Sequence, residues 1–496
     1  MATRLTTILV LVIVGATFIA GLIVGAQRDD ASGPVDLIIV NGKVYPGRGA
    51  DIQEALAVRG NQILRVGSNR EIKRLRRAQT VVLDAHGGSV IPGLNDGRVQ
   101  LMEGGLALER LDLGPAATLD DLEAELRHYA EDTPSQPWVL GRNGDAALFA
   151  TPNASARKIL DDAIDDRPVL VTSEDGTIAW ANSLALEKAG VDRRTRSPKS
   201  GTVVKDRHTG EPTGVLTAAA VDLVARVLPQ PTRADKMTAL RAAIAEAHKV
   251  GLTSVQSVGP SDEEMLLLNE IRQLGDLTLR VYGSIAVPAT ITEADLDELD
   301  GLRQEYPDDP TLKLGGLEIV CTQKAAGTST CDPMTLDRAV ALLDKHGWQI
   351  SVRTTDGADV RAAVEAFQHA TAAGIRPTRD RRDRLDDSLL ADGGARLLFG
   401  SDWPTRPLDP LDAIEQAVAE SSELRQAIDA YTHYAAYAAY DEQRKGTLAP
   451  GMLADIVILS NDVFDNTPES LRETAVTVTI SDGKIVYQRT GSASDD

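Results

Sequence analysis

The side chains that most often bind metals and transfer protons are scarce in this chain. Histidine, cysteine and carboxylate groups supply most metal ligands, and histidine is the commonest general base. The sequence has seven histidines and two cysteines, and no histidine directly follows an apolar, strand-like run. Chain order and spacing indicate no Ser–His–Asp or Cys–His arrangement, although only the folded chain decides which side chains meet. We therefore expect surface or helix-capping roles for His86, His128, His208, His248, His346, His369 and His433.

Several carboxylates stand where strands are expected to end. Asp402 lies in the run GSDWP (residues 400–404), and Asp96 precedes Arg98 in the run NDGRVQ. A site built only from carboxylates would bind Ca²⁺ or Mg²⁺ rather than zinc. The simpler interpretation is that such residues accept backbone hydrogen bonds at the strand ends. The other carboxylates in such positions are Asp145, Glu174 and Asp175.

Composition limits the class of protein. The 496 residues are 43% hydrophobic and 25% charged, as in ordinary globular proteins. A net charge of −21 without a long basic run argues against nucleic acid as a partner. Two cysteines, Cys321 and Cys331, are too few for a disulfide scaffold or a cysteine-rich zinc module, and a single bridge between them remains open.

The N-terminus carries an uncharged apolar segment at residues 5–26. At about 1.5 Å per residue, a helix of this length crosses a hydrocarbon core of about 30 Å. Residues 1–28 are therefore either a membrane anchor or a signal peptide with a cleavage site at residues 24–26. Both interpretations predict that the globular part is exported, after a polar linker at 29–34. In such an oxidising compartment the two cysteines can pair.

The rest of the chain divides into a two-part β region and a long insert. Residues 35–92 and 446–490 consist of short apolar runs separated by Asn-Gly or Asp-Gly turns, which predict small β-sheets. Between them, residues 93–445 alternate helical and strand-like segments, which predicts a parallel sheet, either doubly wound or closed into a barrel. Residues 491–496 form a polar tail.

Several motifs resemble the amidohydrolase superfamily. The segments VIPGLNDGRVQLMEGG (90–105), DGTIAWANSLALEKAG (175–190), FGSDWPTRPLDPL (399–411) and GTLAPGMLADIVIL (446–459) occur in the family's order. They are most similar to the subgroup that includes N-substituted formamide deformylase. The resemblance implies a distorted (β/α)8, TIM-like barrel with a composite β-sandwich formed by both ends of the chain. It also implies hydrolysis of non-peptide carbon–nitrogen bonds.

Members of the family hold one or two divalent metals, usually zinc, and this chain departs from their ligand pattern. The metal lowers the pKa of a bound water and polarises a carbonyl group. By the resemblance, the paired histidines of the first strand fall on Arg98 and Gln100, a third falls on Thr177, and a fourth on Arg353. Arginine stays protonated and offers no lone pair to a metal. We therefore expect neither zinc nor another cofactor.

The barrel is also expected to be incomplete. About 40 residues separate Asp356 from Gly400, whereas one βαβ unit takes about 30 or more. By the resemblance, the strand candidates at 138–142 and 168–173 belong to an insertion rather than to the barrel. The shortened barrel is either open or borrows strands from a second copy, which would make the protein a homo-oligomer.

These observations lead to two functional hypotheses. In the first, the protein is an exported pseudoenzyme that binds a small molecule, and two arginines at the mouth of the barrel favour an anionic group. Arg98 and Arg353 would pair with Asp402 and Asp96, in place of the lost cations. In the alternative, the protein is an active, divergent amidohydrolase with Asp402 as its catalytic residue in a carboxylate-rich or otherwise altered site. The residues expected to line the pocket are Asp96, Arg98, Gln100, Thr177 and Arg353.

Overall fold

The structure, a computed structural model, describes most of the chain after the N-terminal segment. The described residues are 34–149, 156–322, 329–373, 380–385, 388–391, 394–420, 422–464 and 469–490. The predicted anchor or signal peptide and the polar tail lie outside these ranges. Among the described residues, no helix has both the length and the apolar character needed to span a membrane.

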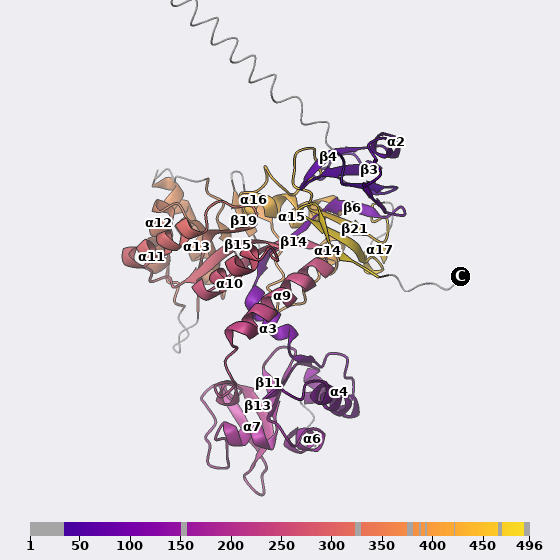
Figure 1. Cartoon of the computed structure of the whole chain (residues 1–496). Helices are drawn as coiled ribbons and strands as arrows, with labels where there is room; N and C mark the ends of the chain where they lie inside the picture. The colour runs from indigo at the N-terminus through magenta and orange to yellow at the C-terminus, as the bar shows by residue number, and fades with distance from the viewer. Residues whose placement is uncertain are drawn as a thin grey trace, which may run out of the picture.

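A curved eight-stranded sheet forms the centre of the molecule (Figure 1). Strands β7 to β18 within it are parallel, and helices α9 to α13 alternate with them along the chain. In sheet order, the strands are β20 (Gly394–Leu397), β19 (Ser388–Ala391), β18 (Arg384–Leu385), β17 (Gln349–Arg353), β16 (Leu312–Val320), β15 (Arg280–Val287), β14 (Leu252–Val258) and β7 (Leu94–Val99). The helices of this part are α3 (Leu101–Leu108), α9 (Arg233–Lys249), α10 (Asp262–Gln273), α11 (Glu293–Glu305), α12 (Pro333–Lys345), α13 (Gly357–Ala372), α14 (Pro410–Glu420), α15 (Leu424–Tyr431) and α16 (His433–Ala438).

The segment that follows β20 lies along β7, the last strand at the other end of the sheet. After β20 the chain continues through residues 398–403 along the edge of β7 that β14 does not occupy. Gly97 N donates to Phe399 O at 2.8 Å, and Asp402 N donates to Arg98 O at 2.8 Å. The fold is therefore α/β and TIM-like, as predicted. It departs from eight parallel strands because β18 has only two residues and β19 runs antiparallel to both neighbours.

Polar side chains fill the inside of the curved sheet. Arg384 on β18 donates to Gln256 Oε1 on β14 at 2.8 Å, although three strands separate β18 from β14 in the sheet. Such a contact must cross the concave side. Strands β7 and β14 are buried at every position, which is typical of parallel strands covered on both faces.

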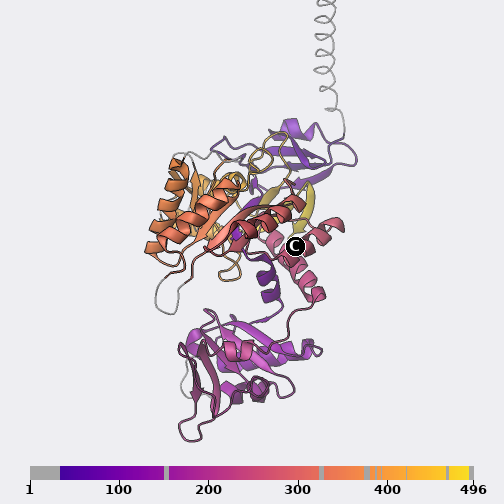
Figure 2. The same cartoon turned by 90° about the vertical axis from the view of Figure 1, so that its left-hand side faces the viewer.

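The chain between α3 and α9 forms a separate six-stranded sheet (Figures 1 and 2). It contains β9 and β10, the two strands that the sequence analysis assigned to an insertion. In sheet order, the strands are β12 (Gly201–Lys205), β13 (Pro212–Ala218), β11 (Ile178–Ala181), β10 (Val169–Ser173), β9 (Val139–Gly144) and β8 (Leu111–Asp112). Its helices are α4 (Leu119–Asp132), α5 (Ala146–Phe149), α6 (Ala156–Ala163), α7 (Ser183–Lys188) and α8 (Asp222–Ala225).

Two smaller sheets make up the β region. The four-stranded sheet has the order β4 (Gln62–Gly67), β3 (Ala55–Arg59), β1 (Leu37–Val40), β5 (Val81–Asp84), with α2 (Asn69–Lys73) beside it. The five-stranded sheet has the order β2 (Lys43–Val44), β6 (Ser89–Pro92), β21 (Ile456–Leu459), β22 (Val476–Ser481), β23 (Lys484–Gln488). Segments more than 350 residues apart pair in it, since Val457 on β21 lies opposite Ile91 on β6. Helix α17 (Glu469–Arg472) precedes β22.

Candidate functional site

Arg98 occupies the carboxyl end of β7, where the family's first histidine would stand. It is only 5% exposed. Its Nη1 donates to Glu318 Oε1 on β16, and its Nε donates to Asp402 Oδ1 at 2.9 Å. Burial disfavours the charged guanidinium, but the carboxylates of Glu318 and Asp402 outweigh burial and raise the pKa of Arg98. Arg98 is therefore a fixed, buried cation.

Two glycines allow the chain to close around Arg98. A Cβ on Gly97 would lie 2.7 Å from Phe399 O, and a Cβ on Gly400 would lie 2.6 Å from the Cβ of Arg98. The segment 398–403 can thus run close to β7 only because neither residue has a side chain. It presents Asp402 with a φ of 55°, in the left-handed region that aspartate tolerates better than most residues.

Arg353, at the end of β17, completes the arrangement. Its Nη2 donates to the same Asp402 Oδ1 at 3.3 Å, and its Nε lies 3.9 Å from Glu318 Oε2. Arg98, Glu318, Arg353 and Asp402 thus form a ring of alternating charges, here called the four-residue cluster. Its formal charge is zero, with Arg98 and Glu318 buried and the side chains of Arg353 and Asp402 35% and 28% exposed.

Asp96 takes the simpler of the two roles expected for it, as an acceptor of backbone hydrogen bonds at a strand end. In the other role it would have been the second carboxylate of the arginine pairs, and the structure gives that position to Glu318. Asp96 is fully buried, and its Oδ1 accepts hydrogen bonds from the backbone N–H groups of Arg98 at 2.9 Å and Ser401 at 3.1 Å. It fastens segment 398–403 to β7, because its side chain points at that backbone.

The two remaining pocket candidates lie in different parts of the structure. Gln100 is the residue before α3, and its backbone N–H donates to Trp403 O at 2.8 Å. Thr177 lies exposed in the turn between β10 and β11 of the six-stranded sheet. Its hydroxyl donates to Asp175 Oδ2 at 2.7 Å. The structure therefore brings together Arg98, Arg353 and Asp402 and leaves Thr177 outside their contacts.

Sequence reasoning missed Glu318. The residue lies in LKLGGLEIV, a run that forms β16 and is buried almost throughout. A carboxylate inside a buried strand needs a cationic partner, because an unpaired buried charge is strongly unfavourable. That need, together with two arginines at strand ends, was the signal available in the sequence.

The donor set at this position does not suit a divalent metal. Both carboxylates already accept hydrogen bonds from guanidinium groups, whose positive charge repels a dication. Within the described ranges, no three His, Cys, Asp or Glu side chains are grouped so that they could hold a metal ion. Asp145 and Asp175 instead accept hydrogen bonds from nearby groups, Ala147 N at 2.7 Å and Ser173 Oγ at 2.7 Å.

His346 and His248 have structural contacts outside the four-residue cluster. His346 lies between Asp300 and Glu293, each 2.8 Å from a ring nitrogen, and these hydrogen bonds raise its pKa. His248 differs from the surface or capping position that we expected. It is buried, and its ring contacts Leu252 O at 2.9 Å and Thr278 Oγ1 at 2.8 Å. Burial lowers its pKa, so His248 is a neutral packing residue.

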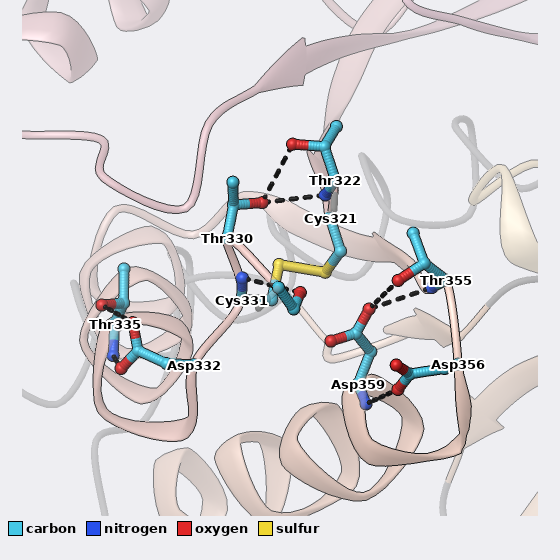
Figure 3. Close-up of a disulfide and its surroundings, with 10 residues drawn as sticks. Cys321, Thr322, Thr330, Cys331, Asp332, Thr335, Thr355, Asp356 and Asp359 are labelled. Carbon is cyan, nitrogen blue, oxygen red and sulfur yellow. Dashed lines mark hydrogen bonds between the residues drawn. A yellow bond between two sulfur atoms is a disulfide. The ribbon is translucent and has the colours of Figure 1, made fainter. Parts of the chain in front are cut away.

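A disulfide lies just beyond the strand that carries Glu318. Cys321 follows β16 and is bonded to Cys331, with a Cα–Cα distance of 5.3 Å (Figure 3). The backbone N–H of Cys321 donates to Arg353 O at 3.0 Å. On the far side of the bridge, Asp332 caps α12 by accepting from Thr335 N at 3.1 Å. The disulfide therefore ties the ends of β16 and β17 to the start of α12, next to the four-residue cluster.

Comparison with known proteins identifies related sequences. A model of the amidohydrolase family matches residues 81–393 and 388–487. The chain is 26% identical over 396 residues to the protein LONG AFTER FAR-RED 3 of Arabidopsis thaliana, a match that covers 74% of this chain and 66% of that protein, a little under two thirds. It is 26% identical over 512 residues to the putative amidohydrolase YtcJ of Bacillus subtilis, covering 88% of this chain and 97% of that protein.

Two further comparisons extend this result. N-substituted formamide deformylase of Arthrobacter pascens is 30% identical over 195 residues, covering 38% of this chain and 35% of the enzyme. Among solved structures, an uncharacterised metal-dependent hydrolase from Pyrococcus furiosus superimposes with a TM-score of 0.64 at 18% identity, covering 86% of this chain and 99% of the other. At that identity, the similarity concerns the fold alone.

Proposed function

The chain belongs to the amidohydrolase family, and from this premise we propose that it is an exported ligand-binding member without the family's metal-dependent catalysis. The observation that carries the proposal is the position of the Arg98 guanidinium between Glu318 and Asp402. A metal holds such carboxylates in place by its charge, and here a side chain of the protein supplies that charge.

The proposed ligand is a small molecule with an anionic group at the mouth of the barrel. Nη2 of Arg98 is buried and has no hydrogen-bond partner among the described residues. Arg353 is the more accessible arginine of the cluster, and its described hydrogen bonds use Nη2 only. A carboxylate or phosphate oxygen would satisfy these spare donors, because guanidinium groups bind oxyanions with two parallel hydrogen bonds.

This ligand class is tested by measuring the binding of inorganic phosphate to the full chain in detergent. Calorimetry at low ionic strength gives the affinity. We expect Arg353→Gln to weaken phosphate binding at least tenfold. The control is Arg361→Gln, which removes an exposed arginine of α13. Equal affinities for phosphate in the wild type and in Arg353→Gln would exclude the proposed ligand site.

The alternative function, a divergent amidohydrolase, is favoured by one feature of Asp402. Both of its arginine contacts use Oδ1, and its side chain is 28% exposed, which leaves Oδ2 as a carboxylate oxygen able to accept a proton. Hydrolysis of N-substituted amides that disappears in Asp402→Asn, in protein that still folds, would establish this alternative. In the favoured proposal, neither the wild type nor Asp402→Asn hydrolyses N-substituted amides.

The proposal also includes export of the globular part and a composite β domain. The apolar segment at residues 5–26 supports export, either with the segment retained as an anchor or after its cleavage. The Cys321–Cys331 disulfide is compatible with an oxidising compartment. We also propose that the two small sheets form one β-sandwich built from both ends of the chain, since Leu56 and Ile456 belong to the same hydrophobic cluster.

A further inference from the structure

A cavity of about 490 Å³ lies where the β region meets the helices of the barrel. Its lining includes Arg48, Thr447 and Met452 of the β region and His433, Tyr437 and Glu442 of the part that follows α15. None of these residues belongs to the four-residue cluster.

The loop that carries Arg48 is held in an unfavourable conformation. Gly47, Arg48 and Gly49 have φ angles of 98°, 56° and 69°, so three successive residues adopt positive φ. Glycine does so readily, but a left-handed conformation costs arginine about 1 kcal/mol. A glycine at position 48 would avoid this cost, so the arginine side chain requires another explanation.

Two side chains hold the backbone of the loop in place. The N–H of Arg48 donates to Asp429 Oδ1 at 3.0 Å, and the N–H of Gly49 donates to Tyr45 Oη at 2.9 Å. Tyr45 Oη itself lies 3.2 Å from Asp429 Oδ1. The Asp429 carboxylate thus fixes the direction of the loop through its backbone.

The guanidinium of Arg48 donates no hydrogen bond to a described residue, and its charge interacts with the carboxylate of Asp429. The side chain of Arg48 is exposed. The loop therefore places at the cavity a cation whose N–H donors are not used by a described residue.

The carboxylate of Glu442 in the lining of the cavity is already paired. Glu442 accepts two hydrogen bonds from Arg382, at 2.8 Å and 2.9 Å, and that guanidinium also lies 3.7 Å from the ring centroid of Tyr437. Arg382 thus neutralises Glu442 and fixes Tyr437. Arg48 then offers its guanidinium to an anionic group, while Tyr437 and Met452 offer apolar surface.

We propose that this cavity is a second ligand site, which binds a small organic molecule through an oxyanion group on Arg48 and packs its apolar part against Tyr437 and Met452. The site goes beyond the proposed function because it shares no residue with the barrel mouth. A cavity of this volume lies within the range of small-molecule sites.

Calorimetric titration of the full chain with phenyl phosphate tests the proposal. We expect Arg48→Gln, which keeps a side chain in the loop but removes its charge, to weaken binding at least tenfold. We expect Arg48→Gly to weaken binding equally while it raises the unfolding temperature, because glycine relieves the left-handed conformation. A purely structural arginine would lower the unfolding temperature when replaced.

Arg353→Gln separates this site from the barrel mouth. The proposal expects the Arg48-dependent binding of phenyl phosphate to persist in that variant. Loss of all binding in Arg353→Gln, or unchanged binding in both Arg48 variants, would overturn the second site. Because phosphate binding to the mouth is measured through Arg353, failure of one site is distinguishable from failure of the other.

Discussion

The guanidinium of Arg98 donates a hydrogen bond to the carboxylate of Glu318, 220 residues further along the chain, and both residues are almost fully buried. Two strands, β14 and β15, separate their strands in the sheet, so the contact spans the inside of the barrel. Asp402 joins Arg98 from segment 398–403. Arg98 therefore links three parts of the barrel wall by charge.

Removal of Arg98 is expected to destabilise the fold strongly. Arg98→Met keeps most of the side-chain volume but leaves Glu318 buried without its principal partner. Loss of one member of a buried ion pair costs about 3–5 kcal/mol, because the remaining charge is uncompensated. The free energy of unfolding in urea measures this loss.

A double variant and an exposed pair serve as controls. The variant Arg98→Met/Glu318→Leu should lose clearly less stability than the sum of its single variants, because it leaves no buried charge. Arg65→Met breaks the exposed pair of Arg65 and Glu71, and should cost at most about 1 kcal/mol. Additive effects of the Arg98 and Glu318 substitutions would show that the two residues are not coupled.

Reduction of the disulfide is expected to loosen the region next to the four-residue cluster. The bridge closes a loop with a sequence separation of 10, which corresponds to about 2–3 kcal/mol in the chain-entropy description. The urea midpoint should therefore fall on reduction, and Cys321→Ser/Cys331→Ser should reproduce that fall. A reductant that still lowers the midpoint of the double variant would point to another cause.

Glu264 should make stability depend on pH. It is buried in the first turn of α10, and burial, together with the nearby charge of Glu103, raises its pKa from 4.5 to about 8. Between these values the folded state keeps a proton that the unfolded state releases, so the free energy of unfolding falls as the pH rises. The variant Glu264→Gln has no carboxyl group at this position, so its free energy of unfolding should not show this fall with pH.

The stability difference between Glu264→Gln and wild type should therefore grow from pH 5 to pH 8, by up to about 4 kcal/mol. Denaturation curves at several pH values in this window measure it. Glu298→Gln, at an exposed position of α11, is the matched control. A difference independent of pH would mean that Glu264 is ionised in the folded state.

The sequence predicted the fold better than the site. Apolar runs and turn residues indicated the α/β insert and the β segments at both ends, because hydrophobic periodicity is local. The antiparallel β19 and the short β18 were not predicted, since their pairing depends on contacts between segments that are distant in the chain. Thr177 was grouped with Arg98 by motif, but only the folded chain shows that it lies in a turn between two strands of another sheet.

For the site, residue chemistry gave the correct kind of interaction and one incorrect partner. The arginines at positions 98 and 353 and the aspartate at 402 were sufficient to predict guanidinium–carboxylate pairs. The choice of Glu318 over Asp96 depends on side-chain direction at β7 and β16. Such long-range geometry has no signature in the spacing of residues along the chain.

The content of divalent metal in the purified protein tests the central claim most directly. The full chain, prepared in detergent without chelators and dialysed against zinc, is analysed by elemental mass spectrometry. If Arg98 takes the place of the family's metal, the number of zinc ions per chain should be close to zero, both in the wild type and in Arg98→Met. About one or two zinc ions per chain, lost on substitution of Asp402 or Glu318, would contradict it.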